Sequence, residues 1–514
     1  MKRFPWLGVI GLMLGIFLGA LDGQIVSTAL PTIVGELGGL DHLSWAVTAY
    51  LLTSAAATPL WGKLGDLYGR KGAYQWSVVL FLAGSVLAGL SRSMEQLIAF
   101  RALQGVGAAG LMVGALAVVG VLVPAGDRGR VQSVIGVLMP VAIVGGPLLG
   151  GVLTDHLSWR WAFYVNLPVG LFALTAVAVG VRLPAVRRTE VRIDWAGAGL
   201  LTTGVLALTL IGSWGGTAYG WASPQVLGAA GAAALATALF VRVERRAVEP
   251  LIPPALFRHR AVTEALVLGF LLGALMLALI GYLPQYLQFV QGASPTAGGL
   301  LLLPLMLGML GSQLATARLT ARGGGRRYPL LGSAVALLGT LLLLTLGADT
   351  ARPLASALTV VAGAGIGLVL QSTLLATMAA VPPRDMGAAM GSVMLFRTIG
   401  GSLGMAALGA VYTAGLSSSL TGALGPDAAG GLTDGGLTPA AVEHLPGRTA
   451  DAVRAAVTTG LHGTLLGAAA VAAAAVAVAA LARRSPDPDR DPAPDPASAE
   501  LPSTDPAPES AGTG

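Results

Sequence analysis

The chain has 514 residues, of which 54% are hydrophobic and only 11% charged, and its formal net charge is +6. A soluble domain of this size carries about a quarter charged residues, so the composition excludes an ordinary soluble protein and indicates a polytopic membrane protein. The absence of cysteine excludes disulfides, thiol catalysis and cysteine-ligated metals. Apolar residues form continuous blocks of about 20 and not the alternating segments of about 10 that build a β-barrel, so the expected fold class is all-α.

Fourteen apolar runs follow one another between charged residues or Gly and Pro. The N-terminus, with its basic start and apolar middle, also resembles a signal peptide, but its apolar run continues to Pro31 and a second run follows at once. We therefore predict fourteen membrane-spanning helices, at about 8–31, 44–62, 74–91, 95–118, 131–153, 161–181, 194–213, 224–243, 262–283, 296–318, 329–347, 354–379, 386–412 and 460–482.

Basic residues orient these spans. With the N-terminus in the cytoplasm, 24 of the 31 Lys and Arg residues lie on the cytoplasmic side, five lie outside, and Arg101 and Arg397 lie within spans. The asymmetry follows the positive-inside rule, so both termini are expected in the cytoplasm. Residues 413–459 are then an external Gly-rich stretch with a short helix near 447–458, and the Pro- and Asp-rich tail 483–514 is expected to be disordered.

Two short strings recur at nearly one spacing, which indicates an internal repeat. "VGGPLLGG" at 144–151 is matched by "IGGSLGMA" at 399–406, and "GRK" at 69–71 is matched by "GRR" at 325–327, 255 and 256 residues later. Chance matching of Gly-rich strings is the alternative. A repeat of six helices in parallel orientation predicts two bundles and an inserted helix pair. The predicted units are residues 1–193, 194–250 and 251–482.

The first predicted span contains a carboxylate. "LDGQIVSTALP" (21–31) places Asp22 in an apolar run, where a charge is costly unless it is paired, solvated or protonated for part of the time. With a rise of ~1.5 Å per residue, Asp22 lies roughly 13 Å and Arg101 roughly 9 Å from the external ends of their spans, so the two side chains could pair. The alternatives are a permanent structural ion pair for Asp22 and, for Arg101, a side chain that extends to the external surface.

"GKLGDLYGRKG" (62–72) resembles the cytoplasmic loop motif of the major facilitator superfamily. The resemblance rests on Gly62, Asp66, Gly69, Arg70 and Lys71. Glycines allow a tight turn close to neighbouring helices, and Asp66 and Arg70, four residues apart, can pair on one helical face. The resemblance implies that this loop latches one conformation of a transporter, whereas a solvated loop that only fixes topology is the alternative.

"FRALQGVGAAG" (100–110) and "MPVAIVGGPLLGG" (139–151) resemble two further motifs of that superfamily, the second of them typical of exporters. The first contains Arg101 and Gln104. In the second, small residues allow close helix packing and the proline allows a bend; a generic glycine packing face is the alternative. The exporter motif comprises Gly146, Pro147, Gly150 and Gly151.

"LDGQIVSTALP" and "WRWAFYVNLPVG" (159–170) resemble the first and sixth helices of the fourteen-helix drug:proton antiporter family. Gln24 stands where that family usually has threonine. The resemblance implies that Asp22 is the main proton-coupling site and Arg101 its partner. The candidates for the substrate or proton pathway are Gln24, Gln104, Asn166, Arg397 and Glu264.

The resemblance implies proton-coupled export of hydrophobic or amphipathic small molecules, such as drugs or antibiotics, across a bacterial cytoplasmic membrane by alternating access. No GxxxxGK[ST] sequence is present, so a proton gradient is the expected energy source, and neither an enzymatic activity nor a cofactor or metal is expected. The tenth and thirteenth spans lack acidic residues, which favours neutral, amphipathic or monocationic substrates over divalent cations. The expected partners are the substrate, protons and the bilayer, without nucleic acid, and the chain is expected to be a monomer. The alternatives are dedicated export of one metabolite or lipid and a membrane scaffold that does not transport.

Overall fold

The fold was obtained as a computed structural model, which describes residues 6–37, 43–183, 194–215, 219–247, 250–293, 301–320, 327–347, 350–434, 442 and 445–484. The first half contains α1 Trp6–Leu37, α2 Leu43–Tyr68, α3 Arg70–Gly89, α4 Met94–Leu122, α5 Ala125–His156, α6 Trp161–Tyr164 and α7 Asn166–Gly180. Two further helices are α8 Trp195–Trp214 and α9 Pro224–Glu244. The second half contains η2 Pro254–Arg258, α10 Arg260–Phe289, α12 Leu303–Thr320, α13 Tyr328–Leu343, α14 Arg352–Ala380, η4 Pro383–Asp385, α15 Met386–Leu424, α16 Pro426–Asp434 and α18 Gly447–Arg484.

The all-helical membrane fold is confirmed. Every one of the fourteen predicted ranges overlaps a helix. In the described part of the chain, ten helical stretches are long and apolar enough to cross a membrane, and α2, α5, α12 and α13 are shorter or less apolar than that limit. The architecture is therefore that of a multi-pass membrane protein, while the count of fourteen spans stays a prediction.

Two helices are longer than the apolar runs that predicted them. α15 continues to Leu424, past the predicted end at 412, and α18 begins at Gly447, before the predicted start at 460. The helix expected near 447–458 is thus the first part of α18. Hydropathy marks the edge of the apolar core, whereas the helix continues because Ala, Leu and Arg remain good helix formers in water.

The sixth predicted span is divided into α6 and α7 at Val165. Pro168 lies three residues after this break and has no N–H to donate to the carbonyl of Tyr164, so the helical ladder is interrupted there. The break places Asn166 at the first residue of α7.

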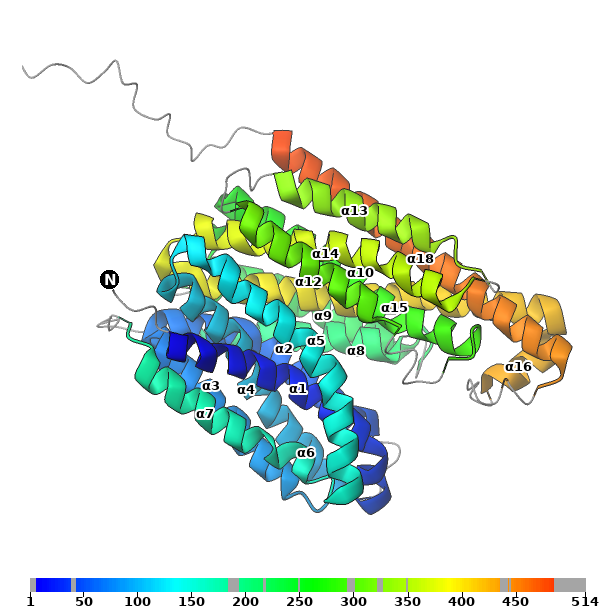
Figure 1. The fold of residues 1–514 in the computed structure, drawn as a ribbon, viewed down its shortest axis with the longest axis horizontal. Helices are drawn as coiled ribbons and strands as arrows, with labels where there is room; N and C mark the ends of the chain where they lie inside the picture. Colours follow the sequence, from blue (N-terminus) through cyan, green and yellow to red (C-terminus); the bar gives the residue numbers. More distant parts are fainter. Residues whose placement is uncertain are drawn as a thin grey trace, which may run out of the picture.

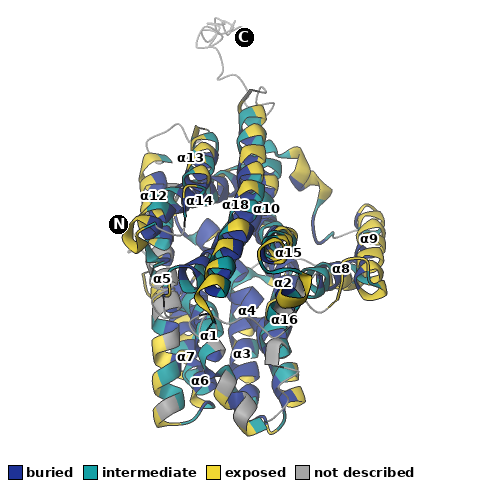
Figure 2. Ribbon diagram, turned by 90° about the vertical axis from the view of Figure 1, so that its right-hand side faces the viewer, coloured by how far each residue is buried: buried dark blue, intermediate teal, exposed yellow. Residues whose placement is uncertain are grey.

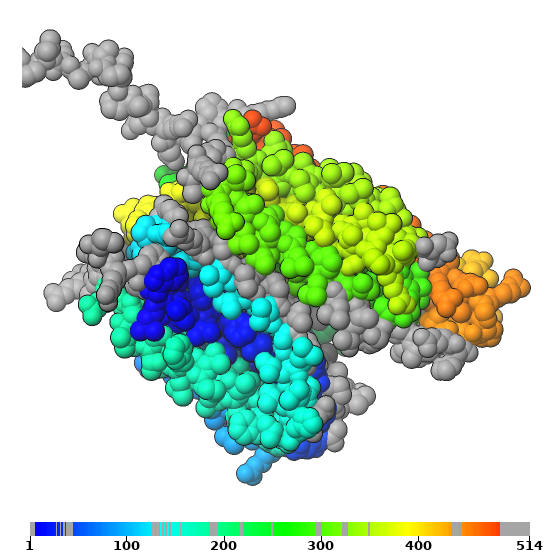
Figure 3. Space-filling view, in the orientation of Figure 1, coloured from blue at the N-terminus to red at the C-terminus, as the bar shows by residue number. Residues whose placement is uncertain are grey.

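The helices form two groups, α1–α7 and α10–α18, which are inclined to each other (Figure 1). A space-filling view shows them as two masses, blue to cyan and green to orange (Figure 3). Each group has an apolar core of its own, and a further apolar cluster joins α14 and α15 to the first group. α8 and α9 pack on each other beside α2 and α15, and exposed side chains cover much of α9 (Figure 2). The tail 485–514 and the repeat string at 325–326 lie outside the described residues.

The two groups contact each other mainly through α2 with α15 and through α5 with α12, and also through α4 with α15. Close to the end of α2, a Cβ atom on Gly62 would overlap the Gly387 carbonyl, so only glycine allows this approach of the two backbones. The basic residues predict that this end is cytoplasmic. The described conformation is therefore closed at the predicted cytoplasmic end.

Candidate functional site

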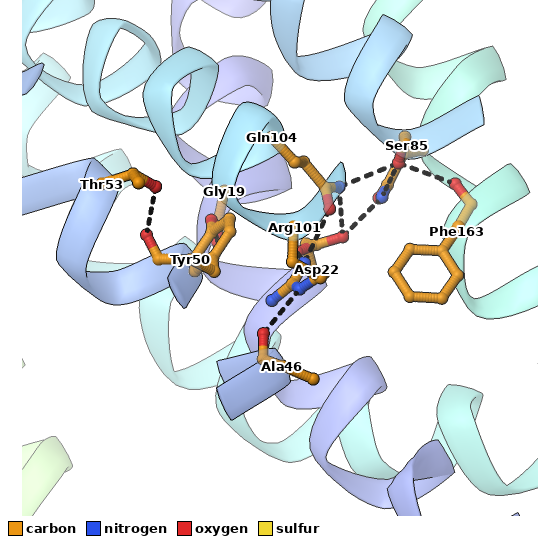
Figure 4. Close-up of polar contacts among 10 residues, drawn as sticks. Gly19, Asp22, Ala46, Tyr50, Thr53, Ser85, Arg101, Gln104 and Phe163 are labelled. Atoms are coloured by element: carbon orange, nitrogen blue, oxygen red, sulfur yellow. Dashed lines mark hydrogen bonds and ion pairs between the residues drawn. The ribbon is translucent and has the colours of Figure 1, made fainter. Parts of the chain in front are cut away.

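Asp22 lies at the centre of a buried polar cluster formed by α1, α3, α4 and α7 (Figure 4). Its side chain is fully buried, and Arg101 donates from Nη1 to Oδ2 at 2.6 Å. Gln104 and Asn166 donate to Oδ1 at 2.8 and 2.7 Å. Three donors thus satisfy an ionised carboxylate in an apolar surrounding, which is the arrangement that makes a buried charge tolerable.

Close helix packing brings these side chains together. Gly84 of α3 lies against the backbone of Gln104, and a side chain at this position would collide with it. Gly105 of α4 lies in the same way against the Tyr50 carbonyl and the Thr53 hydroxyl of α2. Without these glycines α4 could not approach both neighbours closely enough for the polar contacts to form.

Arg101 is held inside the protein and does not extend to the surface. Only 1% of it is exposed, and it donates to the Gln104 side chain at 2.7 Å and to the Ala46 carbonyl at 3.3 Å. Its guanidinium lies over the Tyr50 ring, 4.1 Å from the ring centroid, in a cation–π contact. Tyr50 is fixed by its hydroxyl, which donates to the Gly19 carbonyl at 3.1 Å.

Ser85 is a member of the cluster that the sequence did not single out. Its hydroxyl accepts from Gln104 at 2.9 Å and from Asn166 at 2.8 Å, and it donates to the Phe163 carbonyl at 3.1 Å. A serine in an apolar run has no spacing signature, so only the fold reveals its role. The Oδ1 atom of Asn166 is buried and has no hydrogen-bond partner among the described residues.

The segment where α2 ends and α3 begins forms hydrogen bonds with the second group of helices. Asp66 and Arg70 form the predicted ion pair at 2.6 Å. Asp66 also accepts from the backbone N–H groups of Gly387 and Ala388 at 3.0 and 2.9 Å, so it caps the N-terminus of α15 from the other group. Arg70 in addition donates to the Pro383 carbonyl.

Two more residues of this loop have local roles. Gly69 has a φ of 102°, a conformation that side chains rarely adopt, and it forms the turn between α2 and α3. Lys71 donates from Nζ to the Ala178 carbonyl at 2.6 Å and so ties α3 to the end of α7. We call the contact between residues 62–71 of the first group and residues 383–388 of the second group the latch.

The string at 139–151, which contains the predicted exporter motif, has four glycines that divide into two pairs. A Cβ on Gly146 or Gly150 would collide with α1, at Gln24 and at Thr28 respectively, whereas Gly145 and Gly151 have open space beside them. Pro147 lies within α5. The α1–α5 contact thus depends on two of the glycines, and Gln24 lies at this contact, two residues after Asp22 in the chain.

Glu264 and Arg397 lie away from Asp22. Glu264 is in the second turn of α10 and partly exposed, near the predicted cytoplasmic end. Arg397 of α15 lines two adjoining cavities of about 260 and 520 Å³ between the two groups of helices. Within the described residues, no three His, Asp or Glu side chains are grouped so that they could hold a metal ion.

A second charged contact lies at the opposite end of the first group. Arg160 donates to Glu36 at 2.6 Å, and Trp159 donates to the other oxygen of Glu36 at 2.7 Å. The hydrogen bonds from Arg160 and Trp159 lower the pKa of Glu36 below its ordinary value. The sequence did not suggest this pair, because the two residues are 124 positions apart.

Comparisons with known proteins agree with this fold. Residues 12–405 match the family model described as Major Facilitator Superfamily. An uncharacterized MFS-type transporter of Mycobacterium tuberculosis is 42% identical over 415 residues, which are 80% of this chain and 60% of that protein. The chain therefore spans about 60% of the length of this relative.

Two relatives from Bacillus subtilis are matched over more of their length. Multidrug transporter protein MdtP is 37% identical over 81% of this chain and 77% of its own, and Multidrug resistance protein 3 is 34% identical over 79% of each. The crystal structure of the human organic anion transporter MFSD10 has a TM-score of 0.60, covering 92% of this chain and 100% of that one. At 16% identity, that likeness concerns the fold alone.

Proposed function

Because this chain belongs to the major facilitator superfamily and is a multi-pass membrane transporter, we propose that it is a proton-coupled exporter of amphipathic small molecules that works by alternating access. The observation that carries the proposal is the buried cluster of Asp22, Arg101, Gln104 and Asn166. An ionisable residue at membrane depth is costly, so its presence points to proton movement. The names of the two Bacillus relatives support multidrug efflux.

The cluster provides a chemical reason why a proton should change the conformation. Three hydrogen-bond donors surround the ionised Asp22 carboxylate. Protonation removes the negative charge that holds Arg101 and turns one carboxyl oxygen into a donor. The buried Oδ1 of Asn166, which has no partner among the described residues, is an acceptor for that new O–H after a small rotation. Protonation of Asp22 therefore replaces its hydrogen bonds as an acceptor by a pattern in which it donates to Asn166.

The position of Tyr50 connects this exchange to the substrate cavity. Its ring lies over Arg101 on one side and lines the cavity of about 520 Å³ on the other. When Asp22 is protonated, the guanidinium of Arg101 is released from it and moves relative to the Tyr50 ring. Because Tyr50 lines the cavity, the shape of the cavity wall then changes with the protonation of Asp22. By this route proton binding and substrate binding influence each other.

The latch supplies the second element of alternating access. In the described conformation Asp66 caps α15 and closes the predicted cytoplasmic end. Opening that end breaks the two N–H contacts and the Arg70 contact to Pro383, and the charges become solvated. We place the protein in the cytoplasmic membrane of a bacterium with both termini inside, on the basis of its positive-inside asymmetry.

Export from energised inverted vesicles tests this proposal. The probes are ethidium, N-phenyl-1-naphthylamine and 8-anilinonaphthalene-1-sulfonate, which are cationic, neutral and anionic. We expect uncoupler-sensitive accumulation of at least one probe by the wild type, and its loss in Asp22→Asn. Asp427→Asn, an exposed acid on α16, is the matched control and retains transport. Accumulation that survives both the uncoupler and Asp22→Asn would contradict the proposal.

A further inference from the structure

Two adjoining cavities lie between the groups of helices and share Ile16, Met112, Met394 and Arg397 in their linings. Their volumes of about 260 and 520 Å³ are in the range of a site for one small organic molecule. Most of the lining is apolar, and several methionines contribute to it. Methionine is flexible and polarisable, so this wall can adapt to aromatic bodies of different shape.

Arg397 is the one charged side chain among the described residues that line either cavity. No hydrogen bond or ion pair joins its guanidinium to another described residue. Its backbone packs closely on α10, because a Cβ atom at Gly273 would overlap the Arg397 carbonyl oxygen. The cavity therefore holds a positive charge on a closely packed helix, and no described carboxylate lines the cavity to neutralise it.

Gln371 adds a second donor without an acceptor. It lines the smaller cavity with Arg397, it is only 1% exposed, and its Nε2 is buried without a hydrogen-bond partner among the described residues. Buried polar groups are nearly always paired, because an unpaired donor costs free energy. This buried donor and the guanidinium of Arg397, which line one cavity, point to an acceptor that is supplied by a ligand.

The buried pair of Asp22 and Arg101 does not reverse this polarity. Asp22 and Arg101 neutralise each other at 2.6 Å, and both are buried behind Tyr50, which forms the cavity wall. Among the described lining residues, a cationic ligand thus meets Arg397 and no acid, whereas an anionic ligand meets a guanidinium that can form a bidentate contact.

We infer that the substrate, within the export function proposed above, is an amphipathic organic anion. Its carboxylate, phenolate or sulfonate group binds to Arg397 and Gln371, and its apolar body lies on the methionine-lined wall. The missing acids in the spans favoured neutral, amphipathic or monocationic substrates over divalent cations, and the inference keeps the amphipathic character but adds a negative charge. Arg397 is accordingly a specificity residue.

Binding to the purified full-length protein in lipid nanodiscs tests the inference without requiring transport. The probes are 8-anilinonaphthalene-1-sulfonate and N-phenyl-1-naphthylamine, which share an aromatic frame and differ in one sulfonate. After subtraction of empty nanodiscs, we expect the wild type to bind the anion at least about tenfold more tightly than the neutral probe. Arg397→Gln removes most of this preference by weakening the anion alone, and Arg397→Lys retains part of it.

Control variants separate the charge effect from a folding defect. Arg454→Gln changes the same residue type on α18, where Arg454 pairs with the exposed Asp451, and it should leave both affinities unchanged. Gln371→Leu removes the second donor and should weaken the anion only. Equal affinity of the wild type for the two probes, no saturable binding of the anion, or an unchanged preference in a folded Arg397→Gln protein would each overturn the inference. Loss of proton-coupled export with intact anion preference would instead refute the proposed function alone.

Discussion

The substitution Gly62→Ala tests the latch with the addition of a single methyl group. The new Cβ would lie 2.8 Å from the Gly387 carbonyl carbon and would overlap its oxygen. Carbon atoms in contact are normally about 3.5–4.0 Å apart, so α2 and α15 must separate by about 1 Å. Such overpacking typically costs about 1–3 kcal/mol. Because the overlap is with α15, the cost applies only while the two helices are in contact, and it should shift the equilibrium about 5- to 150-fold toward opening.

Spin labels measure this shift directly, because the chain has no native cysteine. We would introduce cysteines at Tyr68 on α2 and at Arg384 in η4, which are 59% and 75% exposed and belong to opposite groups of helices. Pulsed electron spin measurements should show one short distance in the wild type and a longer population in Gly62→Ala.

The matched control is Gly72→Ala in the same loop region, where a Cβ meets no atom within 4 Å. It should leave the distance distribution unchanged. If Gly62→Ala keeps the short distance while the protein stays folded, the contact does not limit opening and the reasoning about the latch is wrong.

Three further predictions concern the first group of helices. Gly146→Ala introduces a collision with Gln24 and should lower the unfolding temperature in detergent, whereas Gly151→Ala, with open space beside it, should not; equal effects would contradict the α1–α5 packing. Ser85→Ala removes one of the two acceptors of each of the buried Gln104 and Asn166 amides, which keep only Asp22, and should cost about 1–3 kcal/mol in unfolding free energy, while Ser85→Thr costs less. Glu36→Gln removes a half-exposed ion pair and should cost less than about 1 kcal/mol. Because the pKa of Glu36 is lowered in the folded protein, its contribution to the unfolding free energy is present above the ordinary carboxylate pKa and is lost as the pH falls through the lowered value. A difference in unfolding free energy between the wild type and Glu36→Gln that grows in acid would refute this assignment.

Much of the fold was predictable because the bilayer imposes simple rules. Apolar length located a helix at every predicted span, and the i,i+4 spacing of Asp66 and Arg70 predicted their ion pair. The cost of a charge in hydrocarbon singled out Asp22 and Arg101, and the estimate of similar depth brought them together as possible partners. Their role in proton coupling stays a prediction.

The features that could not be predicted depend on contacts between distant segments. The capping of α15 by Asp66 joins residues 321 and 322 positions apart, and nothing at Gly387 or Ala388 marks them as partners. The role of Ser85 could not be predicted either, because small polar residues are common in apolar helices and its partners lie on other helices. The extension of α15 to Leu424 was missed for a different reason: hydropathy reports where the bilayer ends, not where the helix ends.

The central claim is that protonation of Asp22 drives transport, and substrate-driven proton movement in proteoliposomes tests it most directly. Liposomes that contain a pH-sensitive dye and the full-length protein are exposed to a gradient of whichever probe the wild type exports. We expect an uncoupler-sensitive pH change with the wild type and with Asp427→Asn. Asp22→Asn should show no pH change while it still binds the probe. A pH change of wild-type size in Asp22→Asn would show that the proton travels through another group.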